Sequence, residues 1–370
     1  MKFDYTEEQR LLAESVRRFV AQDYTFEARK AIVSSAAGYS PKVWSTFAEL
    51  GLLGIPFAPE DGGFGGGAVD LMPVMEAFGE ALVVEPFLPT IMGARSVALG
   101  GSGELRSRIL PAVIEGRAKL AFAYLEAGSG DDSSGVSLQA HPEGGTWRLD
   151  GRKLAVLHAE AADYIVVTAR TPRGVGLFLV DRAAPGLALE GRPTFDEMRA
   201  ADIDFADVRV DASRRIGGDD ELALVESVID FATALACAEA VGALKSANDA
   251  TLEYLKTRKQ FGVPIGAFQA LQHRMVDMVI ECEQARSMAS LACAKVDAGR
   301  DAGERARVVS AAKIRIADAC RKVSQESVQL HGGMGMTDEL KVSHTFRRLT
   351  VLGWQFGDAA HHLERFARAG

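Results

Sequence analysis

The sequence predicts an α+β protein: a helical N-terminal domain, a small β domain in the middle and a helical bundle at the C-terminus. Three observations support this. Apolar residues recur at helical spacing before about residue 118 and after about residue 216, and short β-type runs fill the stretch between. The 370-residue chain is also too long for one compact core. The predicted domains are residues 1–118, 119–215 and 216–370.

The first block is predicted to be helices separated by turns. Thr6 and Gln9 have the spacing of a capping box, and apolar residues follow at helical spacing. Ser40-Pro41 indicates a second helix start, and Gly51 indicates its end. The glycine-rich residues 59–67 are predicted to be a loop, because they lack both the spacing and the preceding strand of a dinucleotide-binding turn.

The middle block is predicted to be strands. Residues 147–153 suggest a hairpin that turns at Asp150-Gly151, since Asp-Gly is a strong short-range hairpin signal. Three further β-type runs lie at residues 164–168, 176–180 and 201–205, with turn residues between them. Together they predict a small β domain.

The last block is predicted to be helical again. Leu235, Ala238 and Leu244 share one helix face, and a later helix is expected over residues 302–330. Four cysteines lie in these helical stretches without the spacing of a metal or redox site: Cys237, Cys282, Cys293 and Cys320. We expect them to be reduced and buried, as in a cytoplasmic protein.

Charge and hydropathy argue against several partners. The net charge is −8 with both signs interspersed, which favours neither nucleic acid nor an anionic membrane as a partner. The first residues lack the apolar run of a signal peptide, and we expect no segment to reach the ~18 apolar residues of a membrane span. His361 and His362 are adjacent, so they point apart on a helix, and no metal site is predicted.

Two segments carry a family resemblance. Residues 254–273 read YLKTRKQFGVPIGAFQALQH, and residues 329–335 read QLHGGMG. Both resemble the C-terminal domain of the acyl-CoA dehydrogenases, flavoproteins that desaturate acyl-CoA thioesters between Cα and Cβ. The resemblance implies the acyl-CoA dehydrogenase fold, FAD as cofactor, an acyl-CoA substrate and an electron-transfer flavoprotein as electron acceptor.

In this family the flavin lies across a dimer interface, and the neighbouring subunit's C-terminal domain cradles the ADP half. The planar guanidinium of Arg258 suits phosphate oxygens, and a glycine backbone lets a nucleotide approach closely. By resemblance, the cofactor-binding residues are Arg258, Phe261, Gln269, Gln329, Leu330, His331, Gly332 and Gly333.

The half that would hold the flavin ring departs from the family pattern. Leu125 stands where the family usually has a ring-bonding threonine, and Ala155-Val156-Leu157 replaces the family's Trp-Ile-Thr strand. A leucine offers neither donor nor acceptor, so each polar edge of a bound ring would lose a partner at a cost of ~1–3 kcal/mol.

The usual catalytic base is also missing. The family glutamate comes just before a glycine, and the matching glycine is Gly357, so its place is taken by Phe356. Another branch places the base on an earlier helix, where the spacing leads to Ala232. Neither residue can take a proton. The catalytic residue of this chain is therefore unknown.

Carboxylates near these positions are expected to be surface or capping groups. Asp230 and Glu226 lie about one turn from Ala232, and Asp358 lies two residues beyond Phe356. Glu126 matches a family glutamate that is usually not the base.

The residues that would bind the nucleotide part of FAD match the family pattern, whereas those that would hold its ring do not. This combination resembles one subunit of a heteromeric enzyme. Residues 329–339 and 356–365 are most similar to the small subunit of pimeloyl-CoA-type and steroid side-chain α2β2 acyl-CoA dehydrogenases. A large subunit would then supply the ring site and the glutamate. Two alternatives stay open: a homo-oligomeric dehydrogenase with a displaced base, and a flavin-free structural or regulatory subunit.

Overall fold

The computed structural model describes residues 6–298 and 301–369, and its contacts divide them into two compact units. The helical unit comprises the chain up to Ala31, Ala68–Val83 and everything from Thr233 onward. The sheet unit comprises Ile32–Gly67 and Val84–Ala232. The predicted order of helices, strands and helices is confirmed.

Two of the N-terminal helices, α1 and α3, begin where the sequence predicts them. The side chains and backbones of Thr6 and Gln9 exchange both bonds of the capping box, and Ser40 Oγ accepts from Val43 N at the start of the second predicted helix. The helices are α1 (Glu7–Asp23), α2 (Phe26–Val33), α3 (Pro41–Glu49), α4 (Ala68–Ala81), α5 (Phe87–Gly100) and α6 (Gly103–Ile114).

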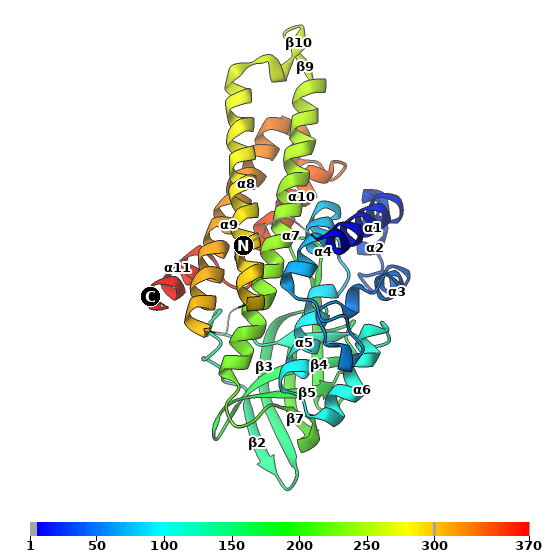
Figure 1. Ribbon diagram of the computed structural model, residues 1–370, viewed down its shortest axis with the longest axis vertical. Coiled ribbons are helices and arrows are strands. Elements are labelled where there is room, and N and C mark those ends of the chain that lie inside the picture. The colour runs from blue at the N-terminus through cyan, green and yellow to red at the C-terminus, as the bar shows by residue number, and fades with distance from the viewer. Residues whose placement is uncertain (1–5, 299–300, 370) are drawn as a thin grey trace. The chain divides into compact units, whose positions relative to one another are not determined.

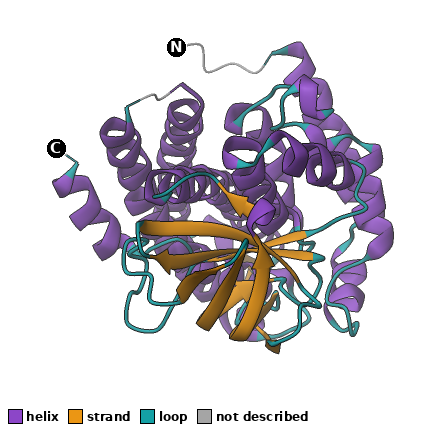
Figure 2. Cartoon of the chain, turned by 90° about the horizontal axis from the view of Figure 1, so that it is seen from below, coloured by secondary structure: helices purple, strands orange, loops and turns teal. Residues whose placement is uncertain are grey.

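The strands of the sheet unit form one twisted sheet (Figure 2). Its order is β6-β7-β3-β2-β4-β5-β8, and β1 pairs with β4 in parallel. Residues such as Ile165, Phe178 and Ile203 build the buried core beneath it. The strands are β1 (Leu120–Ala123), β2 (Gln139–Glu143), β3 (Thr146–Leu157), β4 (Tyr164–Thr171), β5 (Gly174–Asp181), β6 (Leu187–Pro193), β7 (Arg199–Asp211) and β8 (Arg215–Ile216).

The predicted hairpin turn at Asp150-Gly151 is wrong. Strand β3 runs straight through these residues, and the turn lies at Gly144-Gly145, between β2 and β3. The register of β3 against β7 shifts between Leu149 and Gly151, so the Asp-Gly pair forms a bulge. Gly151 has a φ of 144°, which a side chain rarely tolerates, and such glycines mark bulges as well as turns.

Long helices dominate the helical unit (Figure 1): α7 (Leu222–Thr257), α8 (Gln269–Ala298), α9 (Ala302–His331), α10 (Lys341–Trp354) and α11 (Ala359–Arg368). A short two-stranded turn, β9 (Lys259–Gln260) with β10 (Val263–Pro264), joins α7 to α8. The predicted helix over residues 302–330 is confirmed as α9. Of the four free cysteines, Cys237, Cys293 and Cys320 are buried, whereas Cys282 is half-buried.

By length and composition alone, α7 could cross a membrane, contrary to the expectation from the sequence. However, 89% of its apolar window is buried inside the protein. A core helix of this length passes the same test, and its burial accounts for its composition without a bilayer.

Candidate functional site

The first group of predicted site residues surrounds the connection between α7 and α8, which we call the arm (residues 258–268). The guanidinium of Arg258, just beyond the end of α7, forms no hydrogen bond or ion pair with any described residue. Phe261 is 91% exposed and has a φ of 52°. Gln269 begins α8 and is also exposed. The arm and the first residue of α8 therefore present cationic, aromatic and amide side chains to solvent.

The second group lies at the C-terminal end of α9. Gln329 is exposed, and the helix ends at Gly332, whose φ of 59° and ψ of −143° suit glycine. A Cβ built on Gly332 or on Gly333 would meet nothing within 4 Å. The backbone here is open, so a flat ligand could approach it directly.

The two groups converge at one end of the helical unit. The rings of Tyr254 on α7 and His331 on α9 stack with their centroids 4.5 Å apart. His331 Nδ1 lies 2.8 Å from the carbonyl of Ser327, and burial lowers the pKa of His331, which favours the neutral ring as the donor. The side chain of Leu330 is buried, which leaves only its backbone for a ligand.

This end of the bundle fits the nucleotide half of FAD. A guanidinium suits a diphosphate. The open glycine backbone and the exposed amides of Gln269 and Gln329 can contact the rest of the nucleotide. The eight predicted residues remain predictions as cofactor ligands, but most of them lie where a nucleotide could reach them.

The position of the expected base is a tight, buried turn between α10 and α11. Phe356 is 6% exposed and has a φ of 63°, and Gly357 follows with a φ of 106°. Asp358 then caps α11 by accepting from the backbone N–H of His361 at 2.8 Å, as expected of a capping carboxylate. A phenylalanine in left-handed backbone is uncommon, so its surroundings must hold this turn in place.

Two buried side chains hold it. The ammonium of Lys313 on α9 donates to the carbonyls of Gly353 and Gly357, at 2.9 and 2.8 Å. His362 on α11 donates from Nε2 to the carbonyl of Phe356 at 2.9 Å, and its Nδ1 lies 3.2 Å from Ser310 Oγ. Burial, and then the charge of Lys313, lower the pKa of His362 to about 3.

We expect this histidine to make the protein acid-sensitive. Its pKa is about 3 in the fold and near the ordinary histidine value of about 6.5 when unfolded. Between these values the unfolded chain binds the proton, so stability falls as pH falls, by about 2 kcal/mol from pH 7 to pH 5. Urea unfolding at both pH values tests this against His362→Gln, whose amide can still donate to Phe356. Identical pH slopes would rule out His362 as the source.

The alternative base position is buried in the sheet-unit part of α7. Ala232 is fully buried. The expectation that nearby acids lie at the surface is wrong for Asp230, which is fully buried, and Glu226 is half-buried. The reason is that this stretch of α7 is covered on several sides, so burial there does not follow a single helix face.

In the sheet unit, the strand that would contact a flavin ring is committed to other bonds. Leu154 N donates to the carbonyl of Leu125 at 2.9 Å, and Ala155 N donates to Asp202 Oδ1 at 2.9 Å. Hydrogen bonds from Arg192 and Ala155 hold the pKa of Asp202 well below its usual value. Because Leu125 and Leu157 carry no polar side-chain atom, this surface fits a flavin ring poorly.

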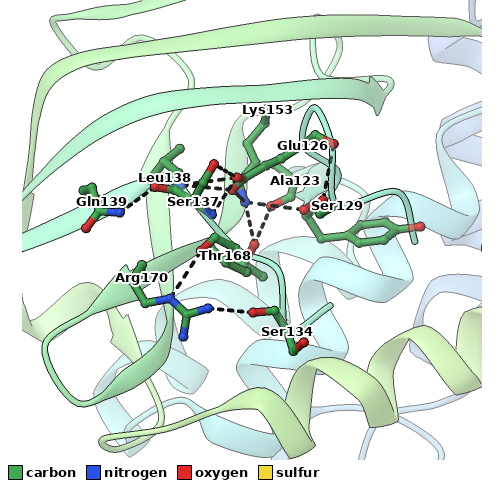
Figure 3. Close-up of polar contacts among 12 residues, drawn as sticks. Ala123, Glu126, Ser129, Ser134, Ser137, Leu138, Gln139, Lys153, Thr168 and Arg170 are labelled. Atoms are coloured by element: carbon green, nitrogen blue, oxygen red, sulfur yellow. Dashed lines mark hydrogen bonds and ion pairs between the residues drawn. The ribbon is translucent and has the colours of Figure 1, made fainter. Parts of the chain in front are cut away.

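A buried ion pair joins this same strand, β3, to the loop after β1 (Figure 3). Lys153 Nζ donates to Glu126 Oε1 at 2.5 Å and to Thr168 Oγ1 at 2.7 Å, and Lys153 and Glu126 are almost completely buried. Glu126 also accepts from the backbone N–H groups of Ser137 and Leu138, at 2.7 and 3.2 Å. The pair thus ties β3, β4 and the loop after β1 together.

The charges of this pair support each other. Burial alone would raise the pKa of Glu126, but the ammonium of Lys153 and the bonds from Ser137 outweigh it and hold the pKa below its usual value. Burial lowers the pKa of Lys153 to about 8 in spite of Glu126. The oxygens of Glu126 are thus bonded within the sheet unit, which agrees with its match to a family glutamate that is usually not the base.

Sequence reasoning missed Lys153, Lys313 and His362 as organising residues. The available signal was the neighbouring apolar residues: residues 154–157 directly follow Lys153, and most residues from 308 to 316 around Lys313 are apolar or small. A lysine in such a setting is notable, because an ammonium is rarely buried without partners. Among the described residues, no cluster of three His, Cys, Asp or Glu side chains could hold a metal.

Known proteins resemble this chain along its whole length. Family models of the acyl-CoA dehydrogenase N-terminal, middle and C-terminal domains match residues 6–117, 121–212 and 222–370. Acyl-CoA dehydrogenase FadE12 of Mycobacterium tuberculosis is 30% identical over 92% of this chain and 90% of its own length.

Solved structures agree with these matches. The ChsE4-ChsE5 complex from Mycobacterium tuberculosis contains a chain with a TM-score of 0.91 and 28% identity, covering 100% of this chain and 98% of that chain. The FAD complex of PigA gives a TM-score of 0.90 at 27% identity, with coverage of 100% and 98%.

Proposed function

Because this chain belongs to the acyl-CoA dehydrogenase family, whose members are FAD-dependent oxidoreductases, we propose that it is the non-catalytic subunit of a heteromeric acyl-CoA dehydrogenase. It completes the FAD site of a larger homologous subunit, which supplies the ring site and the glutamate. The observation that carries this proposal is Phe356: a buried side chain that cannot take a proton, in a turn fixed by Lys313 and His362.

The reaction explains why two subunits are needed. Desaturation removes a proton from Cα of the thioester and a hydride from Cβ, and bound FAD accepts the hydride. In this chain, Arg258 binds the diphosphate, and the backbone of Gly332 and Gly333 faces the nucleotide. No residue at the two expected base positions can take the proton, so the partner must do so.

The subunit composition, substrate, electron acceptor and location are proposed from the same family similarity. The ChsE4-ChsE5 neighbour is a complex of two differently named chains, and we propose an α2β2 assembly for this protein. An acyl-CoA is the proposed substrate, an electron-transfer flavoprotein the electron acceptor and the cytoplasm the location.

Separate and joint expression tests the assignment. Expressed alone, the chain should contain little FAD; co-expressed with its large partner, it should give a yellow complex with one FAD per heterodimer. A homotetramer with one FAD per chain and full activity would instead establish the homo-oligomeric enzyme with a displaced base. A colourless heteromer without FAD would establish a structural or regulatory subunit.

Arg258→Ala should weaken FAD binding by the heteromer. The variant loses charge-assisted bonds worth ~1.5–3 kcal/mol, or roughly 10–100-fold in affinity. Arg258→Lys should recover only part of this, because an ammonium lacks the planar fork. Arg368→Ala, which removes an exposed arginine on α11, is the matched control and should change FAD affinity less than about twofold. Unchanged FAD retention in Arg258→Ala would refute the assigned role.

A further inference from the structure

The two glycines that would face the nucleotide lie in a short connection between α9 and α10, residues 332–338, which we call the cradle segment. The backbone of Gly332 and Gly333 is open on the side where a side chain would stand. The segment packs closely against α9 at Gly335, where an added Cβ would lie 2.7 Å from the carbonyl oxygen of Val328. Backbone that is open to a ligand cannot be held by side chains packed over it, so its two ends must fix its position.

The two ends of the cradle segment are held by different contacts. At the first end the segment continues from α9, where the ring of His331 stacks on that of Tyr254. The second end, at Asp338, is held by two residues of α10. His344 Nε2 lies 3.1 Å from the carbonyl oxygen of Asp338, and Arg347 donates to Asp338 Oδ1, also at 3.1 Å. Both the backbone and the side chain of Asp338 are therefore bonded to α10.

Two guanidinium groups decide which nitrogen of His344 carries the proton. Arg29 on α2 and Arg347 on α10 each approach its Nδ1, at 3.2 and 3.0 Å. A guanidinium can only donate, so Nδ1 accepts both bonds and carries no proton. The proton of the neutral ring is then on Nε2, which donates it to the carbonyl of Asp338. The two arginines thus select the tautomer that can hold the cradle segment.

The ring of His344 is fixed from several directions. Its exposed fraction is 4% and that of Arg29 is 2%, so water competes little for their hydrogen bonds. Arg29 also donates from Nε to the carbonyl of Leu82 at 2.8 Å, which anchors the guanidinium. The ring of Phe26 meets the imidazole edge-on, with the centroids 4.8 Å apart. A donor held in this way can define the position of the backbone that it bonds.

We propose that His344 is a positioning residue for the nucleotide-binding backbone of Gly332 and Gly333. The inference rests on the proposed function, in which this backbone faces the nucleotide half of FAD. His344 acts through Asp338: its Nε2–H fixes the end of the cradle segment, so the glycine backbone is ordered before the cofactor binds. Ordering a binding segment in advance strengthens binding, because less conformational entropy is then lost on association.

Two substitutions of His344 in the reconstituted heteromer test this. His344→Asn keeps an acceptor for the guanidinium groups but loses the donor to Asp338, and should weaken FAD binding about three- to tenfold. His344→Gln has a longer side chain whose amide can donate to Asp338, and should recover part of the loss. Flavin fluorescence on dilution of the complex measures FAD affinity. Hydrogen exchange of residues 332–338 should be faster in His344→Asn than in His344→Gln.

Asn248→Ala is the matched control for a general loss of stability. Asn248 is also buried in the helical unit, but its amide donates to the carbonyl of Met278 on α8 and not to the cradle segment. This variant should change FAD affinity less than about twofold. An equal loss of affinity in Asn248→Ala and His344→Asn, compared at matched urea midpoints, would overturn the positioning role. Faster exchange of residues 332–338 with unchanged FAD affinity would also overturn it.

Arg258→Ala in the same assay separates this inference from the proposed function. If Arg258→Ala weakens FAD binding and His344→Asn does not, the positioning role is overturned and the proposed function stands. If neither variant weakens FAD binding, this chain does not hold the nucleotide, and the proposed function fails as well.

Discussion

Lys153→Met should destabilise the protein by ~3–5 kcal/mol, because it leaves the carboxylate of Glu126 buried without its counter-charge. Methionine has a similar volume, so the loss measures the charge and not a cavity. Both side chains are almost fully buried, and solvent does not screen them. The unfolding midpoint in urea reports the loss. Hydrogen exchange of residues 137–139 shows whether the stability is lost at this site, because the backbone N–H groups of residues 137 and 138 donate to Glu126.

A double variant separates the charge from the hydrogen bonds. In Lys153→Met with Glu126→Gln, the glutamine oxygen can still accept from Ser137 and Leu138, and no charge is buried. Replacing both partners of a buried pair is usually far less costly than removing one, so we expect ~1–2 kcal/mol. If the double variant were as unstable as Lys153→Met alone, an uncompensated charge could not be the cause.

Local signals predicted the helix starts correctly because their causes are local. The capping box of Thr6 and Gln9 involves residues three apart, and the structure contains both of its bonds. Asp150-Gly151 misled for the opposite reason: the same dipeptide suits a turn and a bulge, and pairing of β3 with β7 decides between them. That pairing joins residues some fifty positions apart, so no short window contains it.

The same distinction holds for the site. The arm and the end of α9 lie in two short segments, and the resemblance of these segments to the acyl-CoA dehydrogenases predicts a nucleotide cradle there. By contrast, the turn at Phe356 depends on Lys313, more than forty positions earlier in the chain. The surface or capping position expected for Asp230 is wrong because this part of α7 is buried almost all round, whereas most helices bury a single face.

Truncation of Phe356 should destabilise the fold, and the left-handed backbone at this position decides how the alanine and glycine variants compare. Phe356→Ala removes a buried ring and should cost ~3–5 kcal/mol. Phe356→Gly removes one carbon more but relieves the φ of 63°, a relief worth roughly 1 kcal/mol. The glycine variant should therefore be at least as stable as the alanine variant by urea unfolding. A clearly less stable glycine variant would show that the left-handed turn carries no strain.

The effect of Phe356 on catalysis decides which subunit holds the substrate. Phe356→Glu should create no activity in the isolated chain, because Leu125 and Leu157 still offer no polar contacts to a flavin ring. Its buried carboxylate would also have a raised pKa and would destabilise the fold. In the heteromer, Phe356→Ala should leave kcat/KM nearly unchanged for a short, a dicarboxylic and a steroid-like acyl-CoA alike, since the partner binds the acyl group. If this chain instead held the substrate with a displaced base, Phe356 would line the acyl cleft, and the truncation would shift the preference among the three substrates. A large shift would place the active site in this chain and refute its assignment to the partner.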